Sequence, residues 1–166
     1  LNLNGIRSAV NKGCLEWLLD AYRRSEAGDK EAWLPDIIHC HDWHAGYLVD
    51  LAKRDRRYRD VLRNIPIVFT VHNFKYQGNW DYRHATPEDR DDGQSPLAPI
   101  DSPDLQKQNA LKRGLLHADA VSTVSPTHAL EILTPEFSEG LLETLQQVRG
   151  KLVGMKGIIR SKGVSD

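Results

Sequence analysis

The chain has no apolar run of the roughly 20 residues that a membrane-spanning helix needs, and no charged-then-apolar signal segment opens it. It also lacks an excess of charge of one sign, because 22 basic and 23 acidic residues leave a net charge of -1. These absences argue against a membrane protein and against a partner attracted by charge, such as nucleic acid. We expect a soluble globular protein without membrane or nucleic-acid partners.

Cysteine is scarce as well. The two cysteines, Cys14 and Cys40, fall on a predicted helix and a predicted strand, where a small reduced core side chain is a more natural role than a disulfide. This pattern favours a reducing, cytoplasmic compartment.

Three common fingerprints are missing from the sequence. It contains no Gly-x-Gly-x-x-Gly, no Gly-x-x-x-x-Gly-Lys-Ser/Thr and no Gly-x-Ser-x-Gly, so dinucleotide-binding, P-loop and α/β-hydrolase functions lack their signatures. We expect no cofactor, and a polar site suited to holding a polyhydroxyl ligand.

Three short apolar runs dominate what is present. They cover residues 36–40, 65–71 and 118–124, are too short for helices, and are each followed by helix-compatible sequence. Such runs predict parallel strands covered on both faces, in one α/β domain with a Rossmann-like sheet and flanking helices. The length of 166 residues is enough for one such domain with its own core.

Polar residues follow each of these runs directly. Open parallel sheets bind ligands outside the carboxyl ends of their strands, so we expect these side chains to converge on one rim: His41, Asp42, His72, Asn73 and Ser125. An alternative for Asp42 is equally open, because an aspartate before a helix often only caps it.

Helical periodicity fills most of the remaining chain. An amphipathic helix is predicted over residues 5–26, with an apolar stripe that packs on the sheet and consists of Ile6, Val10, Cys14, Trp17, Leu18 and Ala21. Further helices are predicted at residues 43–55, 102–117, 127–133 and 138–148, and a last strand at 151–159. Ser125-Pro126 reads as a helix start. The irregular stretch 72–106 begins with aromatic residues at 74–82, which suit either a sugar-binding surface or ordinary packing.

A metal site is a second possibility. His39 and His41 point to the same side of a strand, and a His-x-His pair after a strand opens the site of some metal-dependent hydrolases. His72 is a candidate third ligand, although no downstream cluster of His and Asp supplies further ligands. We therefore expect no metal, and keep a histidine-rich hydrolase as an alternative.

Three motifs in register carry a resemblance to a known family. They read HCHDWHAG at 39–46, VFTVHNFKYQG at 68–78 and ADAVSTVSPT at 118–127, with LKRGLL between them at 111–116. In order and spacing they resemble bacterial glycogen synthases and plant starch synthases, over about residues 14–154. The resemblance implies a two-domain GT-B fold, in which residues 1–154 form part of the N-terminal Rossmann-like domain and 155–166 are a divergent tail.

The resemblance also implies an activity. Such enzymes are retaining glycosyltransferases that move glucose from ADP-glucose, less often UDP-glucose, to the non-reducing end of an α-1,4-glucan. By position in the motifs, Asp42 and His72 are implied as catalytic residues, with His72 beside the transferred glucose. The implied substrate-binding residues are His41, Asn73, Tyr76 and Gln77.

Two family features have no counterpart in the sequence: the N-terminal lysine-threonine-glycine-glycine motif that meets the donor, and the second domain that holds the diphosphate. The chain also begins at Leu1 rather than Met and departs from the family pattern after Met155. We expect part of a longer synthase that is inactive alone. A stand-alone glucan-binding module is the alternative.

Overall fold

The computed structural model describes residues 2–3, 13–78, 80–99 and 101–155. Its centre is a five-stranded sheet with the strand order β1-β2-β3-β4-β5, in which all neighbours run parallel. The strands are β1 Asn2–Leu3, β2 Ile38–His41, β3 Ile67–Val71, β4 Ala120–Thr123 and β5 Leu152–Gly154. The predicted α/β class with a parallel sheet is confirmed, and β2, β3 and β4 each begin two residues later than the apolar runs suggested.

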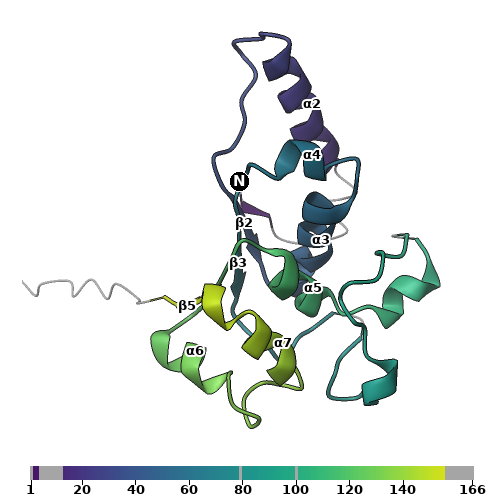
Figure 1. The fold of residues 1–166 in the computed structure, drawn as a ribbon, viewed down its shortest axis with the longest axis vertical. Helices are drawn as coiled ribbons and strands as arrows, with labels where there is room; N and C mark the ends of the chain where they lie inside the picture. The colour runs from purple at the N-terminus through teal and green to yellow at the C-terminus, as the bar shows by residue number, and fades with distance from the viewer. Residues whose placement is uncertain (1, 4–12, 79, 100, 156–166) are drawn as a thin grey trace, which may run out of the picture.

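Helices connect these strands (Figure 1). The α-helices are α2 Cys14–Glu26, α3 Gly46–Arg54, α4 Arg59–Leu62, α5 Ala110–His117, α6 Pro126–Glu131 and α7 Leu142–Gln147. Short 3-10 helices are η1 Trp43–Ala45, η2 Pro87–Asp89, η3 Pro103–Lys107 and η4 Arg149–Lys151. In the part of the chain that the structure describes, no helix is long and apolar enough to cross a membrane.

The order of the strands decides which face of the sheet is covered. Parallel crossovers are right-handed in nearly all proteins, so strands that follow one another in sequence order receive their connecting helices on the same face. In Figure 1, α3 and α5 lie on one side of β2 and β3. The helix α6 contacts β4 and β5, and the expectation that helices cover both faces stays a prediction.

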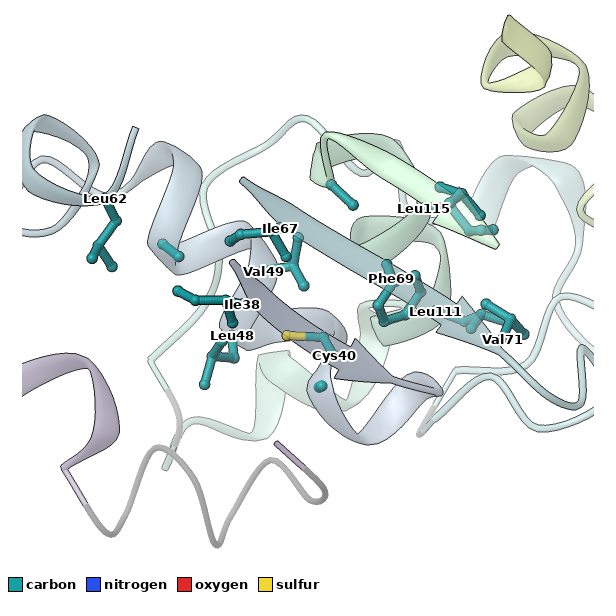
Figure 2. Packing of buried hydrophobic residues seen from close by; sticks show 14 of the residues in the cluster. Ile38, Cys40, Leu48, Val49, Leu62, Ile67, Phe69, Val71, Leu111 and Leu115 are labelled. Carbon is teal, nitrogen blue, oxygen red and sulfur yellow. The ribbon is translucent and has the colours of Figure 1, made fainter. Parts of the chain in front are cut away.

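The covered face holds the core. Figure 2 shows its strand side chains packed against those of α3 and α5. All of them are fully buried, and removing such a side chain from a core typically costs about 2–5 kcal/mol; they include Ile38, Cys40, Ile67, Phe69, Val71, Leu48, Val49, Leu111 and Leu115. Cys40 is a free thiol in this core, and Cys14 is a free thiol that is only partly buried.

The opposite face alternates with the core in the pleat and carries different residues. Towards the middle it is polar, and towards β5 it is apolar and open, with Val153 60% and Val124 44% exposed. Its other members are His39, His41, Val68, Thr70, Ala120 and Ser122. We call this set the open face.

The first predicted helix agrees in part with its expected packing. Leu18 and Ala21 are buried as predicted, together with Leu15 and Leu19, whereas Trp17 is 45% exposed. The helix contacts α4. Ile6 and Val10, which the prediction also placed in the stripe, lie outside the described residues.

Other helix boundaries in the structure also differ from the predicted ones. The helix predicted over 102–117 is divided into η3 and α5, because Asn109 interrupts it and caps α5 by accepting from the N–H of Lys112. Ser125 caps α6 as predicted, accepting from the N–H of His128. The helix predicted over 138–148 covers only α7, and the last strand only β5, beyond which residues 156–159 lie outside the described part.

A buried ion network ties the long connection between β3 and α5 to the helices. Arg113 is 0% exposed and donates to both carboxylate oxygens of Asp91 at 2.8 Å, to Asp50 at 2.5 Å and to the carbonyl oxygen of Ser95 at 3.0 Å. Bidentate contacts of this kind hold both groups in a defined orientation. The connection is therefore anchored, although it contains little regular structure.

Candidate functional site

The ends of β2 and β3 form the candidate site. Asp42 and His72 are the first residues after these parallel strands, and the main-chain N–H of His72 donates to Oδ1 of Asp42 at 2.7 Å. The two predicted catalytic residues are thus in direct contact at the rim where open parallel sheets bind ligands.

Asp42 has an unusual backbone. Its φ of 55° and ψ of 178° lie in a region that is nearly exclusive to glycine. Its side chain makes no cap hydrogen bond to the following turn, so the interpretation of Asp42 as a helix cap is wrong. The carboxylate reaches across to β3 instead. Strain of about 1–3 kcal/mol held at a strand end is typical of functional positions.

Three histidines line up on the open face beside this contact. The ring centroids of His39 and His41 are 4.2 Å apart, and those of His41 and His72 are 5.3 Å apart at an interplanar angle of 26°. Nδ1 of His41 lies 3.0 Å from Nε2 of His72. The site is therefore a row of imidazoles that ends at the rim.

The surroundings of His39 and His41 favour neutral rings. Burial, followed by the nearby His72, lowers the pKa of His39. Burial also lowers the pKa of His41, and His39 and His72 add to this effect, while Asp42 acts in the opposite direction. Neutral imidazoles offer one donor and one acceptor each.

Polar groups inside the sheet continue the row, and sequence reasoning missed them. Nε2 of His39 lies 2.7 Å from Oγ1 of Thr70, which lies 2.6 Å from Oγ of Ser122. A signal was present for Thr70, because it is the single polar residue in the apolar run 65–71. The hydroxyls of Thr70 and Ser122 fix the ring of His39.

The predicted acceptor residues separate into exposed and buried ones. Asn73 and Tyr76 are exposed, Tyr76 by 60%, and Oδ1 of Asn73 accepts from the N–H of Lys75 at 2.9 Å. Phe74 between them is buried against the core. Residues 73–82, which we call the aromatic loop, therefore present only part of their aromatic surface to solvent.

Gln77 lies inside the protein. It is 1% exposed; its amide nitrogen donates to the carbonyl oxygens of Phe74 and Glu139, and its amide oxygen accepts from Tyr82 N and Asn109 Nδ2. All four of its hydrogen-bonding positions are used. The side chain of Gln77 thus lies on the buried side of the aromatic loop rather than at its surface.

The two remaining predictions concern Ser125 and a metal. Ser125 follows β4 on the same edge of the sheet, and its hydroxyl is used as the cap of α6.

Within residues 2–3, 13–78, 80–99 and 101–155, no group of three or more His, Cys, Asp or Glu side chains is arranged to hold a metal ion. His39, which the metal hypothesis required, points its Nε2 at Thr70.

Comparison with known proteins identifies a family that this chain matches. The family described as starch synthase catalytic domain matches residues 7–147. The glycogen synthase of Halalkalibacterium halodurans is 43% identical over 124 residues, which are 73% of this chain and 24% of that protein. The glycogen synthase of Pasteurella multocida is 41% identical over 128 residues, again 24% of that protein.

A solved structure agrees with these relatives. The catalytic domain of starch synthase IV from Arabidopsis thaliana, bound to ADP and acarbose, shares 29% identity with a TM-score of 0.55 over 82% of this chain and 27% of that chain. The present chain thus spans about a quarter of the length of the proteins that it matches.

Proposed function

Because the chain belongs to the starch synthase catalytic domain family, we propose that it forms part of an enzyme that transfers glucose from a nucleotide sugar to an α-1,4-glucan. The donor is ADP-glucose, or less often UDP-glucose, and the new unit joins the non-reducing end with retention of configuration. The observation that carries the proposal is the contact between Asp42 and His72 at the strand ends of a matched family domain. A cytoplasmic location stays a prediction from the sequence.

The proposed roles follow from exposure and hydrogen bonding. His72 lies beside the transferred glucose, where a preorganised imidazole supports charge that develops in the transition state. Asp42 uses Oδ1 for the main chain of His72, and its Oδ2 accepts a sugar hydroxyl. Asn73 and Tyr76 receive the acceptor glucan, because their side chains are exposed directly after His72.

Two of the predicted binding residues act indirectly in this proposal. Gln77 supports the aromatic loop from behind, since its amide is consumed by protein groups. His41 contacts the ring of His72 and supports it.

The transfer itself belongs to a longer protein. A departing diphosphate needs preorganised cationic groups, and the family resemblance puts these in a second domain beyond this quarter of the length. We place the present chain in the N-terminal half of a two-domain GT-B enzyme, with residues 155–166 outside the family-like part. Purified alone, it should incorporate no glucose from ADP-glucose into glycogen.

Binding and transfer are tested separately. The purified chain is titrated with maltoheptaose. Tyr76→Ala should weaken binding, whereas Phe137→Ala, at an aromatic residue that is 44% exposed and not part of the aromatic loop, should not. Binding without transfer would also be the behaviour of a stand-alone glucan-binding module. A complete synthase of this family separates the enzymatic role from that alternative. In the complete synthase, the counterpart of His72→Ala should lower turnover about 100- to 1000-fold, with nucleotide affinity nearly unchanged.

If the Tyr76→Ala and Phe137→Ala variants bind maltoheptaose equally well, the assignment of Asn73 and Tyr76 to the acceptor glucan is wrong. A fall in turnover of less than about tenfold in the complete enzyme would make His72 structural.

A further inference from the structure

The ring contact between His41 and His72 restricts where protons can reside. Nδ1 of His41 and Nε2 of His72 are 3.0 Å apart, so one N–H lies between them. In a neutral pair one ring donates and the other accepts. Either His41 donates from Nδ1, or His72 donates from Nε2.

The second nitrogen of His41 distinguishes the two arrangements. Among the described residues, Nε2 of His41 is buried and has no hydrogen-bond partner. If His72 donated, a neutral His41 would carry its own proton on Nε2, as a buried donor without an acceptor. If His41 donates, Nε2 is a bare acceptor. Buried N–H groups without a partner are rarer in proteins than under-satisfied acceptors.

We infer that His41 is a positioning residue, which donates its Nδ1–H to Nε2 of His72 and holds the His72 ring as the tautomer that carries its proton on Nδ1. In the described part of the chain, Nδ1 of His72 has no hydrogen-bond partner, and the side chain is exposed. His72 therefore meets a ligand as a hydrogen-bond donor. A sugar oxygen is the acceptor that suits it, and this last step alone rests on the proposed function.

The surroundings of His41 support the arrangement. The ring of His39 lies beside that of His41, with the two centroids 4.2 Å apart, and Thr70 holds His39 in place. Besides these two histidines, Asp42 is the charged group whose field reaches His41. Burial and the neighbouring rings lower the pKa of His41, so at neutral pH it is a neutral ring with a single proton to place.

The test reads the tautomer of His72 directly and needs no sugar. Long-range ¹H–¹⁵N correlation on the ¹⁵N-labelled chain at neutral pH shows which ring nitrogen is protonated, and His72→Asn assigns the signals. His41→Asn keeps an N–H near the position of Nδ1, whereas His41→Leu removes it. The matched control is His44→Asn, at a histidine that stacks on Trp43 at 4.0 Å.

In the wild type, His41→Asn and His44→Asn, we expect His72 with its proton on Nδ1. In His41→Leu the ratio of the Nδ1–H to the Nε2–H form should fall roughly fivefold to tenfold, the equivalent of one hydrogen bond. A wild-type His72 protonated on Nε2 overturns the inference even if His41→Leu does not fold, and so does an unchanged ratio in a folded His41→Leu. Failure of glucan binding would overturn only the proposed function.

Discussion

Asp42 and His72 are joined by one hydrogen bond of 2.7 Å between a carboxylate oxygen and a main-chain N–H. The bond spans two neighbouring strands, and it engages the backbone of His72 rather than its ring. The imidazole ring of His72 contacts His41 and remains accessible to a ligand. Main-chain position and ring orientation of the same residue are therefore controlled by two different side chains.

The first prediction tests the carboxylate. Asp42→Ala removes the acceptor and keeps a Cβ at a φ of 55°, so it should lower the free energy of unfolding by about 1–2 kcal/mol. Asp42→Gly also loses the acceptor but relaxes the backbone strain, and should therefore be more stable than Asp42→Ala. Urea denaturation measures both. An alanine variant as stable as the wild type would show that the bond contributes nothing.

The second prediction concerns Arg113. Replacing it by methionine leaves two carboxylates, Asp50 and Asp91, without their buried partner. Breaking a buried ion pair in this way typically costs about 3–5 kcal/mol, so Arg113→Met should unfold at much lower urea. Arg63→Met, at an exposed arginine, is the matched control and should be nearly neutral. Similar denaturation midpoints for the two variants would contradict the network.

The third prediction concerns the close approach of two helices. A Cβ on Gly46 would overlap the carbonyl oxygen of Ala110 in α5, whereas a Cβ on Gly150 meets nothing within 4 Å. Gly46→Ala forces α3 and α5 apart and should cost at least about 1–3 kcal/mol. Gly150→Ala should leave the melting temperature unchanged within a degree or two. If both variants melt alike, the helices are not in contact through this glycine.

The fourth prediction is a pH dependence. Hydrogen bonds from Ser95, from both its hydroxyl and its main-chain N–H, together with one from Gln94, lower the pKa of Asp92 from 3.8 to about 2. Because the folded pKa lies below the unfolded one, this contribution to stability is present above about pH 4 and is lost as the pH falls towards 2. Asp92→Asn lacks it, so the difference in unfolding midpoint between wild type and variant should shrink over that range. A difference that stays constant with pH would count against these bonds.

Sequence reasoning recovered features that depend on neighbours along the chain. The strand runs, the cap at Ser125 and the proximity of Asp42 to His72 all follow from local patterns and from the parallel sheet rule. Features that depend on distant partners were missed. Gln77 resembles a surface residue of a polar loop, but its amide is buried against Asn109 and Glu139, which are 32 and 62 residues away.

The packing of helices was equally out of reach. Alternation along a strand separates two faces but does not say which of them the helices will cover. Trp17 was placed inside because it recurs at helical spacing with other apolar residues, yet the buried residues of α2, which contacts α4, are three leucines and Ala21. Such choices are made by the shape of the neighbouring surface.

The sequence order of the strands also has a consequence for how the chain acquires its structure. Each strand pairs with the one made just before it, so none has to be inserted between two strands that are already paired. The entropic cost of closing a loop grows only slowly with its length, and chains fold from the N-terminus during synthesis. The sheet can therefore grow at one edge as the polypeptide leaves the ribosome, with each new β-strand finding its template already in place.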